Sequence, residues 1–243
     1  MVRRLLLGMF PVLWTGVVIA TDVPTDAIRA RMAKLFPDDA VTSVTKAPVP
    51  GLYEVMLGAS LFYMTGDGRY VMRGDLIDLQ EKINISDQKR AQARGQAFAA
   101  LDHKQLIEFL PNSGKILETL YVYTDIDCGY CRKMHLEVPK LNDAGIAVNY
   151  LAFPRSGLKG ESFDKATAVW CSDNRQEALT AAKAGKKVVA PKCDSPVAAQ
   201  FNLGQTMGVS GTPAVYTADG TAVGGYVPAS ELIKMVHECM PFA

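Results

Sequence analysis

The stretch ILETLYVYTDIDCGYC, residues 116–131, decides how this chain is interpreted. Residues 116–123 are rich in aromatic and β-branched side chains and predict a strand. Residues 129–142 then predict a helix, so the motif Cys128-Gly129-Tyr130-Cys131 lies where a strand passes into a helix. A pair of cysteines two residues apart at the start of a helix indicates redox chemistry.

The position of Cys128 favours a reactive thiolate. Free N–H groups and the positive end of the helix dipole lower the pKa of a thiol at a helix N-terminus, which makes Cys128 the expected nucleophile. Cys131 lies one turn further on and can resolve a mixed disulfide. We expect an exposed sulfur on Cys128 and a shielded sulfur on Cys131. Half of a zinc site has the same spacing, but the sequence has no second CxxC and no C-x-x-H pair, so neither a metal nor a cofactor is expected.

The elements that surround this motif predict the fold class. Further strands are expected at 146–153, 214–216 and 222–226, and further helices at 162–186 with a break near 171–174, at 196–207 and at 229–240. The order βαβ, helical insertion, ββα predicts an α+β protein with a thioredoxin-like fold that carries an inserted helical segment.

The motif Gly211-Thr212-Pro213 precedes the strand expected at 214–216. Proline donates no hydrogen bond to a sheet, so the first position of a strand suits it. In a thioredoxin-like fold this position is the cis-proline loop that faces the reactive cysteines. The backbone of Thr212 is then available to an extended substrate peptide. The alternative is an ordinary turn proline.

Three cysteines lie outside the motif. Cys171 and Cys193 fall among predicted helices, and they form either a second redox pair or a structural disulfide. We favour the structural disulfide because neither residue belongs to a CxxC; it would stabilise the fold by about 3 kcal/mol. Cys239 is left over and is interpreted as a buried thiol or an intermolecular partner. His135 is expected at the solvated surface.

The N-terminal third predicts a small α+β unit. A helix beginning at Thr25 has an apolar face, and strands are expected at 41–45, 52–57, 61–64 and 69–72. The residues of that apolar face are Ile28, Met32, Leu35 and Phe36. So small a unit buries little surface alone, which suggests that it packs against a second copy. Residues 86–110 predict one helix. Its polar half, 87–96, is expected to be a solvated connector, and its second half is expected to dock on the neighbouring domain.

Composition and the first residues narrow the function classes. The 243 residues carry a formal net charge of +1 and no basic run, so no nucleic-acid partner is expected. Arg3 and Arg4 precede an apolar stretch, 5–20, which predicts a secretory signal peptide over residues 1–20. The alternative is an uncleaved anchor. Export would place the cysteines in an oxidising compartment.

Several motifs together resemble the DsbC/DsbG family of periplasmic thiol:disulfide isomerases. They are the runs 124–131, 150–155 and 208–215 together with Trp170-Cys171. The resemblance implies a cystatin-like dimerisation domain over residues 21–80, a linker helix over 81–111 and a thioredoxin-like catalytic domain over 112–243. The spacing of Cys171 and Cys193 also matches the second cysteine pair of the family.

The family implies a specific activity. Two chains form a homodimer in which Cys128 attacks incorrect disulfides of misfolded secreted proteins and Cys131 resolves the mixed disulfide. The expected substrate contacts are Gly129, Tyr130, Thr212 and Pro213. A DsbD-type membrane reductase would keep the pair reduced in the periplasm, and chaperone activity would accompany isomerisation. The alternatives are a DsbA-like thiol oxidase and a DsbG-like chaperone or sulfenic-acid reductase.

Asp127 departs from the DsbC sequences of this family, which have a threonine at this position. We expect its carboxylate to cap the helix by accepting an N–H bond from Gly129 or Tyr130. Its charge would then oppose a thiolate on Cys128. The alternative is a side chain that points into solvent, where its charge is screened.

Overall fold

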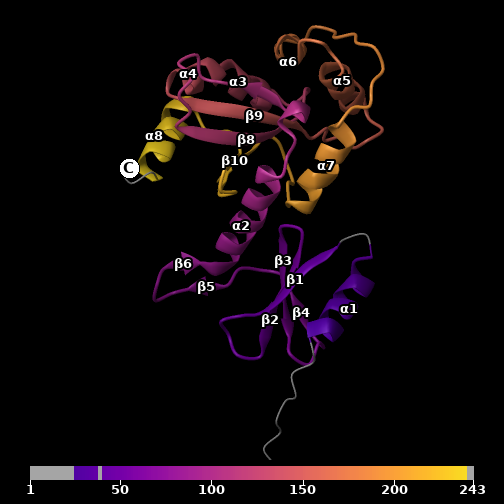
Figure 1. Cartoon of the computed structure of the whole chain (residues 1–243), viewed down its shortest axis with the longest axis vertical. Coiled ribbons are helices and arrows are strands. Elements are labelled where there is room, and N and C mark those ends of the chain that lie inside the picture. Colours follow the sequence, from indigo (N-terminus) through magenta and orange to yellow (C-terminus); the bar gives the residue numbers. More distant parts are fainter. Residues whose placement is uncertain (1–24, 38–39, 240–243) are drawn as a thin grey trace, which may run out of the picture.

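The computed structural model describes residues 25–37 and 40–239, which form two domains joined by one helix (Figure 1). The predicted signal peptide, residues 1–20, lies outside the described residues. Within the described ranges, no helix has the length and hydrophobicity needed to cross a membrane.

The N-terminal domain is an antiparallel sheet covered by one helix. The helix is α1 (Thr25–Leu35), and the strands lie in the order β1 (Val41–Lys46), β2 (Leu52–Leu57), β3 (Ser60–Thr65), β4 (Val71–Met72). Ile28 and Met32 pack on alternate residues of β2, as the pattern predicts. Leu35 was wrongly placed in this core: it ends the helix and is exposed, whereas Phe36 packs on Phe62 with ring centroids 5.0 Å apart.

The single helix predicted over residues 86–110 is wrong in its second half. After the short ribbon of β5 (Ile77–Asp78) and β6 (Ile83–Asn84), helix α2 runs over Ile85–Ala99. A 3₁₀ turn, η1 (His103–Gln105), then leads into strand β7 (Ile107–Phe109), which pairs antiparallel with the central sheet. Local sequence favours a helix here, but an open sheet edge supplies backbone partners and burial for Ile107.

The polar half of α2 lies between the two domains but is less solvated than its composition predicts. Arg94 within it and Ser86 just before it are buried, whereas the other residues of 87–96 are partly or fully exposed. The Ser86 hydroxyl lies 2.6 Å from the phenol oxygen of Tyr63 in the N-terminal sheet, and Arg94 Nε donates to the Gly220 carbonyl at 2.7 Å. Each of these buried side chains therefore has a specific partner, and α2 is held by both domains.

The C-terminal domain has a five-stranded sheet in the order β11-β10-β8-β9-β7 (Figure 1). Its remaining strands are β8 (Glu118–Thr124), β9 (Ile146–Ala152), β10 (Ala214–Thr217) and β11 (Ala222–Gly224). Its helices are α3 (Gly129–Leu136), α4 (Val138–Asp143), α5 (Glu161–Trp170), α6 (Arg175–Lys183), α7 (Val197–Thr206) and α8 (Ala229–Cys239). The thioredoxin-like fold with a helical insertion, α5 to α7, is confirmed. The helix predicted over 129–142 is divided at Glu137 because Pro139 lacks an N–H for the next turn.

Strand β8 separates two hydrophobic cores. Leu120 and Val122 face the core under α3 to α6 and α8, whereas Tyr121 and Tyr123 face the core that includes Phe98 of α2. This alternation follows from the two-residue period of a strand. With both faces of β8 covered, the loop from its end to α3 is held in place. Helix α8 ends at Cys239. Whether Cys239 is a buried thiol or an intermolecular partner concerns a side chain that lies outside the described part of the structure.

Candidate active site

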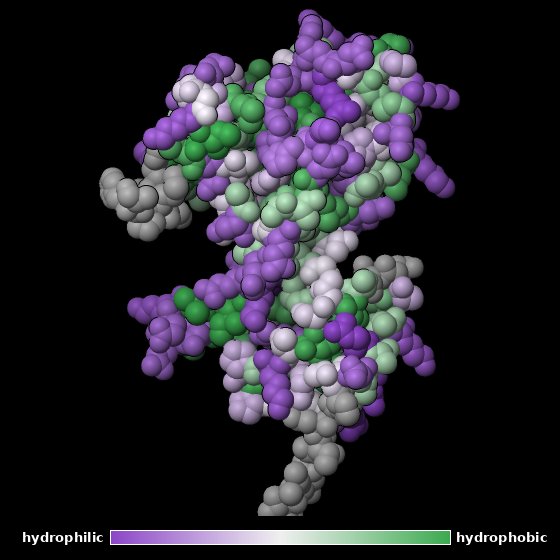
Figure 2. All heavy atoms as spheres, in the orientation of Figure 1, coloured by the Kyte–Doolittle hydropathy of each residue, from purple (hydrophilic) through white to green (hydrophobic). Residues whose placement is uncertain are grey.

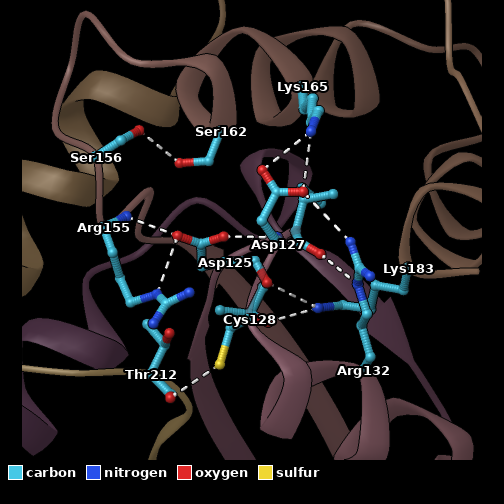
Figure 3. A network of polar contacts seen from close by, with 12 residues as sticks. Asp125, Asp127, Cys128, Arg132, Arg155, Ser156, Ser162, Lys165, Lys183 and Thr212 are labelled. Atoms are coloured by element: carbon cyan, nitrogen blue, oxygen red, sulfur yellow. Dashed lines mark hydrogen bonds and ion pairs between the residues drawn. The ribbon is translucent and has the colours of Figure 1, made fainter. Parts of the chain in front are cut away.

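Cys128 occupies the N-cap position of α3 and faces the loop before β10 (Figure 3). Its Sγ donates to the Thr212 carbonyl at 3.1 Å, and the Thr212-Pro213 peptide bond is cis, as expected. The predicted exposed sulfur is wrong: Cys128 is only 3% exposed. The expectation considered the helix end alone, whereas the Thr212 loop packs over it.

The two cysteines differ in how readily they ionise. Burial opposes a charge on Cys128, but the Thr212 side chain, the N–H and thiol of Cys131 and the charge of Arg155 favour it, so its pKa lies below the ordinary value. Burial dominates at Cys131, which is 1% exposed, and raises its pKa. Cys128 therefore ionises first, which is what an attacking thiol paired with a resolving thiol requires.

Asp125 organises the loop that presents Cys128. Its buried carboxylate accepts the N–H of Asp127 at 2.6 Å and the N–H of Arg155 at 2.7 Å. Arg155 Nε adds a third contact at 3.3 Å. One carboxylate thus ties the end of β8 to the segment after β9 and places a positive charge beside the cysteines. No sequence pattern indicated a role for Asp125 or Arg155, although both fall in the runs that resemble the DsbC/DsbG family.

Asp127 does not cap α3, which corrects the expectation from the sequence. The N-terminus of the helix has no side-chain cap. The carboxylate instead binds Lys165 Nζ at 3.0 and 3.1 Å and the Arg132 guanidinium at 3.3 Å (Figure 3). Two cations on α5 and α3 attract it more strongly than a neutral N–H does. The alternative of a free, solvent-facing side chain is also wrong.

The surface beside Cys128 is aromatic and open. Tyr130 is 62% exposed and stacks on Tyr226 with ring centroids 5.8 Å apart, while Lys133 Nζ lies 4.7 Å from the centroid of the Tyr226 ring. A Cβ added to Gly129 would meet nothing within 4 Å. A bound peptide therefore has room to approach this end of α3.

His135 was wrongly placed at the surface. It is buried, with Nδ1 3.2 Å from the Tyr150 hydroxyl and Nε2 3.0 Å from the Thr180 hydroxyl. Burial lowers its pKa to about 4, with a smaller contribution from the charge of Lys183. The helical period contained the signal, because His135 follows the inward-facing Cys131 by four residues.

Lys183 is a functional candidate that sequence analysis missed. It ends α6 in the helical insertion, yet it is 5% exposed and donates to the Thr124 hydroxyl at 2.7 Å and to the Asp125 carbonyl at 3.5 Å. Both partners lie at the end of β8, beside the cysteines. Its neighbours Leu179 and Ala182 are buried, and this helical spacing was the available signal.

The second cysteine pair forms a disulfide between the end of α5 and the segment before α7. Cys171 and Cys193 have Cα atoms 5.7 Å apart. In the ranges 25–37 and 40–239, no cluster of histidine, cysteine, aspartate and glutamate is arranged to hold a metal ion.

Comparisons with known proteins identify the family of this chain. A family model described as a thioredoxin-like domain matches residues 103–239, and one described as the disulfide bond isomerase protein N-terminal domain matches residues 19–87. The thiol:disulfide interchange protein DsbC of Escherichia coli K12 is 33% identical over 214 residues, 87% of each chain. The Salmonella typhimurium protein of the same name is 32% identical over 97% of this chain and 95% of its own.

A solved structure is also similar to part of this chain. The crystal structure of a disulfide interchange protein from Neisseria gonorrhoeae matches with a TM-score of 0.51 and 28% identity, covering 57% of this chain and 97% of that one. The sequence relatives extend across both domains of the present chain, including its N-terminal sheet. The chain belongs to the DsbC family of thiol:disulfide interchange proteins.

Proposed function

We propose that this thiol:disulfide oxidoreductase is a homodimeric periplasmic isomerase that rearranges incorrect disulfides in misfolded secreted proteins. The observation that carries the proposal is the position of Cys128, whose Sγ lies 3.1 Å from the cis-proline loop at a helix N-terminus. Its pKa is lowered while that of Cys131 is raised. This asymmetry gives one attacking and one resolving thiol.

The reaction begins with the Cys128 thiolate. It attacks one sulfur of a substrate disulfide and forms a mixed disulfide, while the other substrate sulfur leaves as a thiolate. A second substrate thiol can then attack, which returns Cys128 unchanged and completes an isomerisation. If none does, Cys131 attacks Cys128 and releases the substrate reduced. Gly129, Tyr130, Thr212 and Pro213 contact the substrate peptide in this proposal.

Dimerisation is assigned to the N-terminal domain, residues 21–80. Strand β4 is at the edge of its sheet, and an unpaired edge is a template for another chain. Hydrophobic side chains remain exposed at and beyond this edge: Tyr70, Val71, Met72, Ile77, Leu79 and Ile83. Figure 2 shows hydrophobic side chains at the surface of the lower domain. A second copy would cover them, and residues 81–111, with α2, would then carry the catalytic domain, residues 112–243.

The proposed function also includes an electron donor and a chaperone activity. An isomerase must keep Cys128 reduced in an oxidising compartment, so we propose a DsbD-type membrane reductase as its electron donor. The exposed Tyr130 and its stacked neighbour Tyr226 offer an apolar surface to unfolded segments, which supports chaperone activity.

The Cys171–Cys193 disulfide is proposed to be structural. A double variant, Cys171→Ala with Cys193→Ala, should lose about 3 kcal/mol of stability in urea unfolding. It should keep its reductase rate, because the pair takes no part in exchange. If the reductase rate fell while the free energy of unfolding stayed the same, this pair would instead belong to the redox cycle.

Refolding of scrambled ribonuclease, with the molar mass of the catalyst measured in the same sample, tests the function. The wild type should be a dimer and should recover ribonuclease activity, whereas Cys128→Ser should be a dimer without activity. Val71→Glu with Met72→Lys should be a monomer that still reduces insulin but isomerises poorly.

Leu35→Lys is the matched control for the edge variant, because Leu35 is also exposed in the N-terminal domain but lies on α1. It should remain a dimer. A monomeric wild type, or an edge-variant monomer with full isomerase activity, would contradict the proposal and favour a DsbA-like oxidase.

A further inference from the structure

Lys183 is a buried positive charge without an ionic partner among the described residues. Burying an ammonium group is costly unless other groups compensate. Its hydrogen bonds go to the Thr124 hydroxyl, at 2.7 Å, and the Asp125 carbonyl, at 3.5 Å (Figure 3). The Asp125 carboxylate already accepts hydrogen bonds from the N–H of Asp127 and from the N–H and Nε of Arg155. A buried lysine kept beside a redox pair therefore calls for a chemical explanation.

The Thr124 hydroxyl connects Lys183 with Cys131. Its oxygen accepts a hydrogen bond from Lys183, which leaves its own hydrogen free for the Cys131 sulfur. A hydrogen bond with Thr124 and the charge of Lys183 both favour the Cys131 thiolate, against the effect of burial. Amine, hydroxyl and thiol thus form one continuous path that ends on the resolving sulfur.

The other charged and titratable groups around Lys183 do not serve this purpose. Arg132 repels its charge, and His135 is neutral because burial keeps its pKa low. Burial raises the pKa of the Tyr150 phenol, whose ring lies 5.6 Å from Nζ. Burial lowers the pKa of Lys183 to about 8, and charges on Cys131, Cys128 and Asp125 oppose that effect. Lys183 therefore remains mostly protonated at neutral pH, and its charge can act on the cysteines.

We propose that Lys183 is a positioning residue for the resolving step, in which its ammonium group, acting through the Thr124 hydroxyl, stabilises the Cys131 thiolate. This inference rests on the roles proposed above for Cys128 and Cys131. It explains how a thiol that is 1% exposed can carry the negative charge of a nucleophile.

The proton leaves Cys131 only after Cys128 has reacted. Attack by Cys128 forms its bond to a substrate sulfur, breaks the substrate disulfide and removes the negative charge of Cys128. The positive charge of Lys183 is then no longer shared with a Cys128 thiolate. The Cys131 thiol loses its proton to solvent, and the thiolate that remains accepts a hydrogen bond from the Thr124 hydroxyl, whose oxygen accepts from Lys183.

Cys131 next attacks Cys128. The Cys128–Cys131 bond forms, the mixed disulfide breaks, and the second substrate sulfur leaves with the electron pair and takes up a proton. Two electrons have passed from the cysteine pair to the substrate.

A two-step reaction with 5,5′-dithiobis(2-nitrobenzoate) tests the inference on the mature protein. The first thionitrobenzoate released reports attack by Cys128, and the second reports resolution by Cys131. Lys183→Met, which keeps the length of the side chain, should slow the second release by about tenfold or more near neutral pH. The first release should be nearly unchanged, and the difference in the second should close at alkaline pH, where Cys131 ionises unaided.

Three further variants complete the test. Thr124→Val should also slow the second release, and Thr124→Ser, which keeps the hydroxyl, should restore it. Lys186→Met is the matched control, since Lys186 is exposed just after the same helix, and both of its releases should match the wild type. These threonine variants also decide the question if Lys183→Met does not fold.

An unchanged rate and pH profile of the second release in Lys183→Met and Thr124→Val would overturn the inference. An equal slowing of both releases would also overturn it, because that indicates a general loss of site structure. Cys131→Ala separates the two proposals, since it should release one equivalent only. Two equivalents from that variant would refute the cysteine roles themselves.

Discussion

The two sides of helix α3 hold their polar groups in opposite environments. On the inner side, Asp125, Lys183 and His135 are each less than a tenth exposed, and their hydrogen bonds go to specific protein atoms. On the outer side, Asp127 and its partner Lys165 have side chains that are 34% and 41% exposed. Water can solvate these outer groups when an ion pair is broken, but it cannot easily reach the inner groups.

This difference distinguishes a carboxylate that holds the active-site loop in place, Asp125, from one that forms only partly exposed ion pairs, Asp127. Asp125 and Asp127 are two residues apart and chemically identical. The Asp125 carboxylate accepts hydrogen bonds from two backbone N–H groups, whereas the Asp127 carboxylate pairs with cationic side chains at the surface. Substitutions on the inner side should therefore change stability or the order of ionisation of the cysteines. Substitutions on the outer side should change little.

The largest effect is expected for Asp125→Ala. It leaves the N–H groups of Asp127 and Arg155 without an acceptor, so we expect a loss of about 4 kcal/mol in the free energy of unfolding. Insulin reduction should slow as well, because Arg155 loses its anchor near Cys128. Urea unfolding and an insulin turbidity assay measure the two effects. A loss below about 1 kcal/mol would place Asp125 in the same class as Asp127.

His135 predicts a dependence of stability on pH. Unfolded histidine takes up a proton near pH 6.5, whereas the folded pKa is about 4, so the unfolded state binds more protons between these values. Stability due to neutral His135 is complete above pH 6.5 and should fall by about 3 kcal/mol as pH drops to 4.

Urea unfolding between pH 4 and 7 measures this slope. His135→Met should show a smaller fall across that range, whatever its absolute stability. Equal slopes for His135→Met and the wild type would show that His135 is not a buried neutral group in solution.

The smallest effect is expected for Asp127→Thr. Its ion pairs with Lys165 and Arg132 are partly exposed, so the change should cost less than about 1 kcal/mol. The thiolate absorbance of Cys128, titrated against pH, should be nearly superimposable on that of the wild type, because Lys165 and Arg132 already balance the carboxylate. A clear fall in the Cys128 pKa would restore the direct opposition that the sequence predicts.

The prediction from sequence was accurate where local pattern and local chemistry coincide. The alternation of residues 116–123, the CGYC motif and the proline after Thr212 gave the strand, the helix start and the cis-proline loop. The prediction was wrong at residues 100–110, where a strand replaces the end of a helix, and at His135 and Asp127. In each of these cases the partner that decides the outcome is distant along the chain: Tyr150 for residue 107, Thr180 for His135 and Lys165 for Asp127.

Local sequence was sufficient to predict the thioredoxin-like fold from the order of strands and helices, and the candidate cysteine pair from its spacing at a helix start. The resemblance of several separate motifs indicated the family. The surroundings of that pair depend on contacts that form only when the chain is folded. The helical insertion delivers Lys183 to Thr124, 59 positions away, and Arg155 reaches Asp125 across 30 positions. No periodicity encodes contacts of this length. Burial then gives them their effect, since a charge excluded from water must be balanced by the atoms beside it.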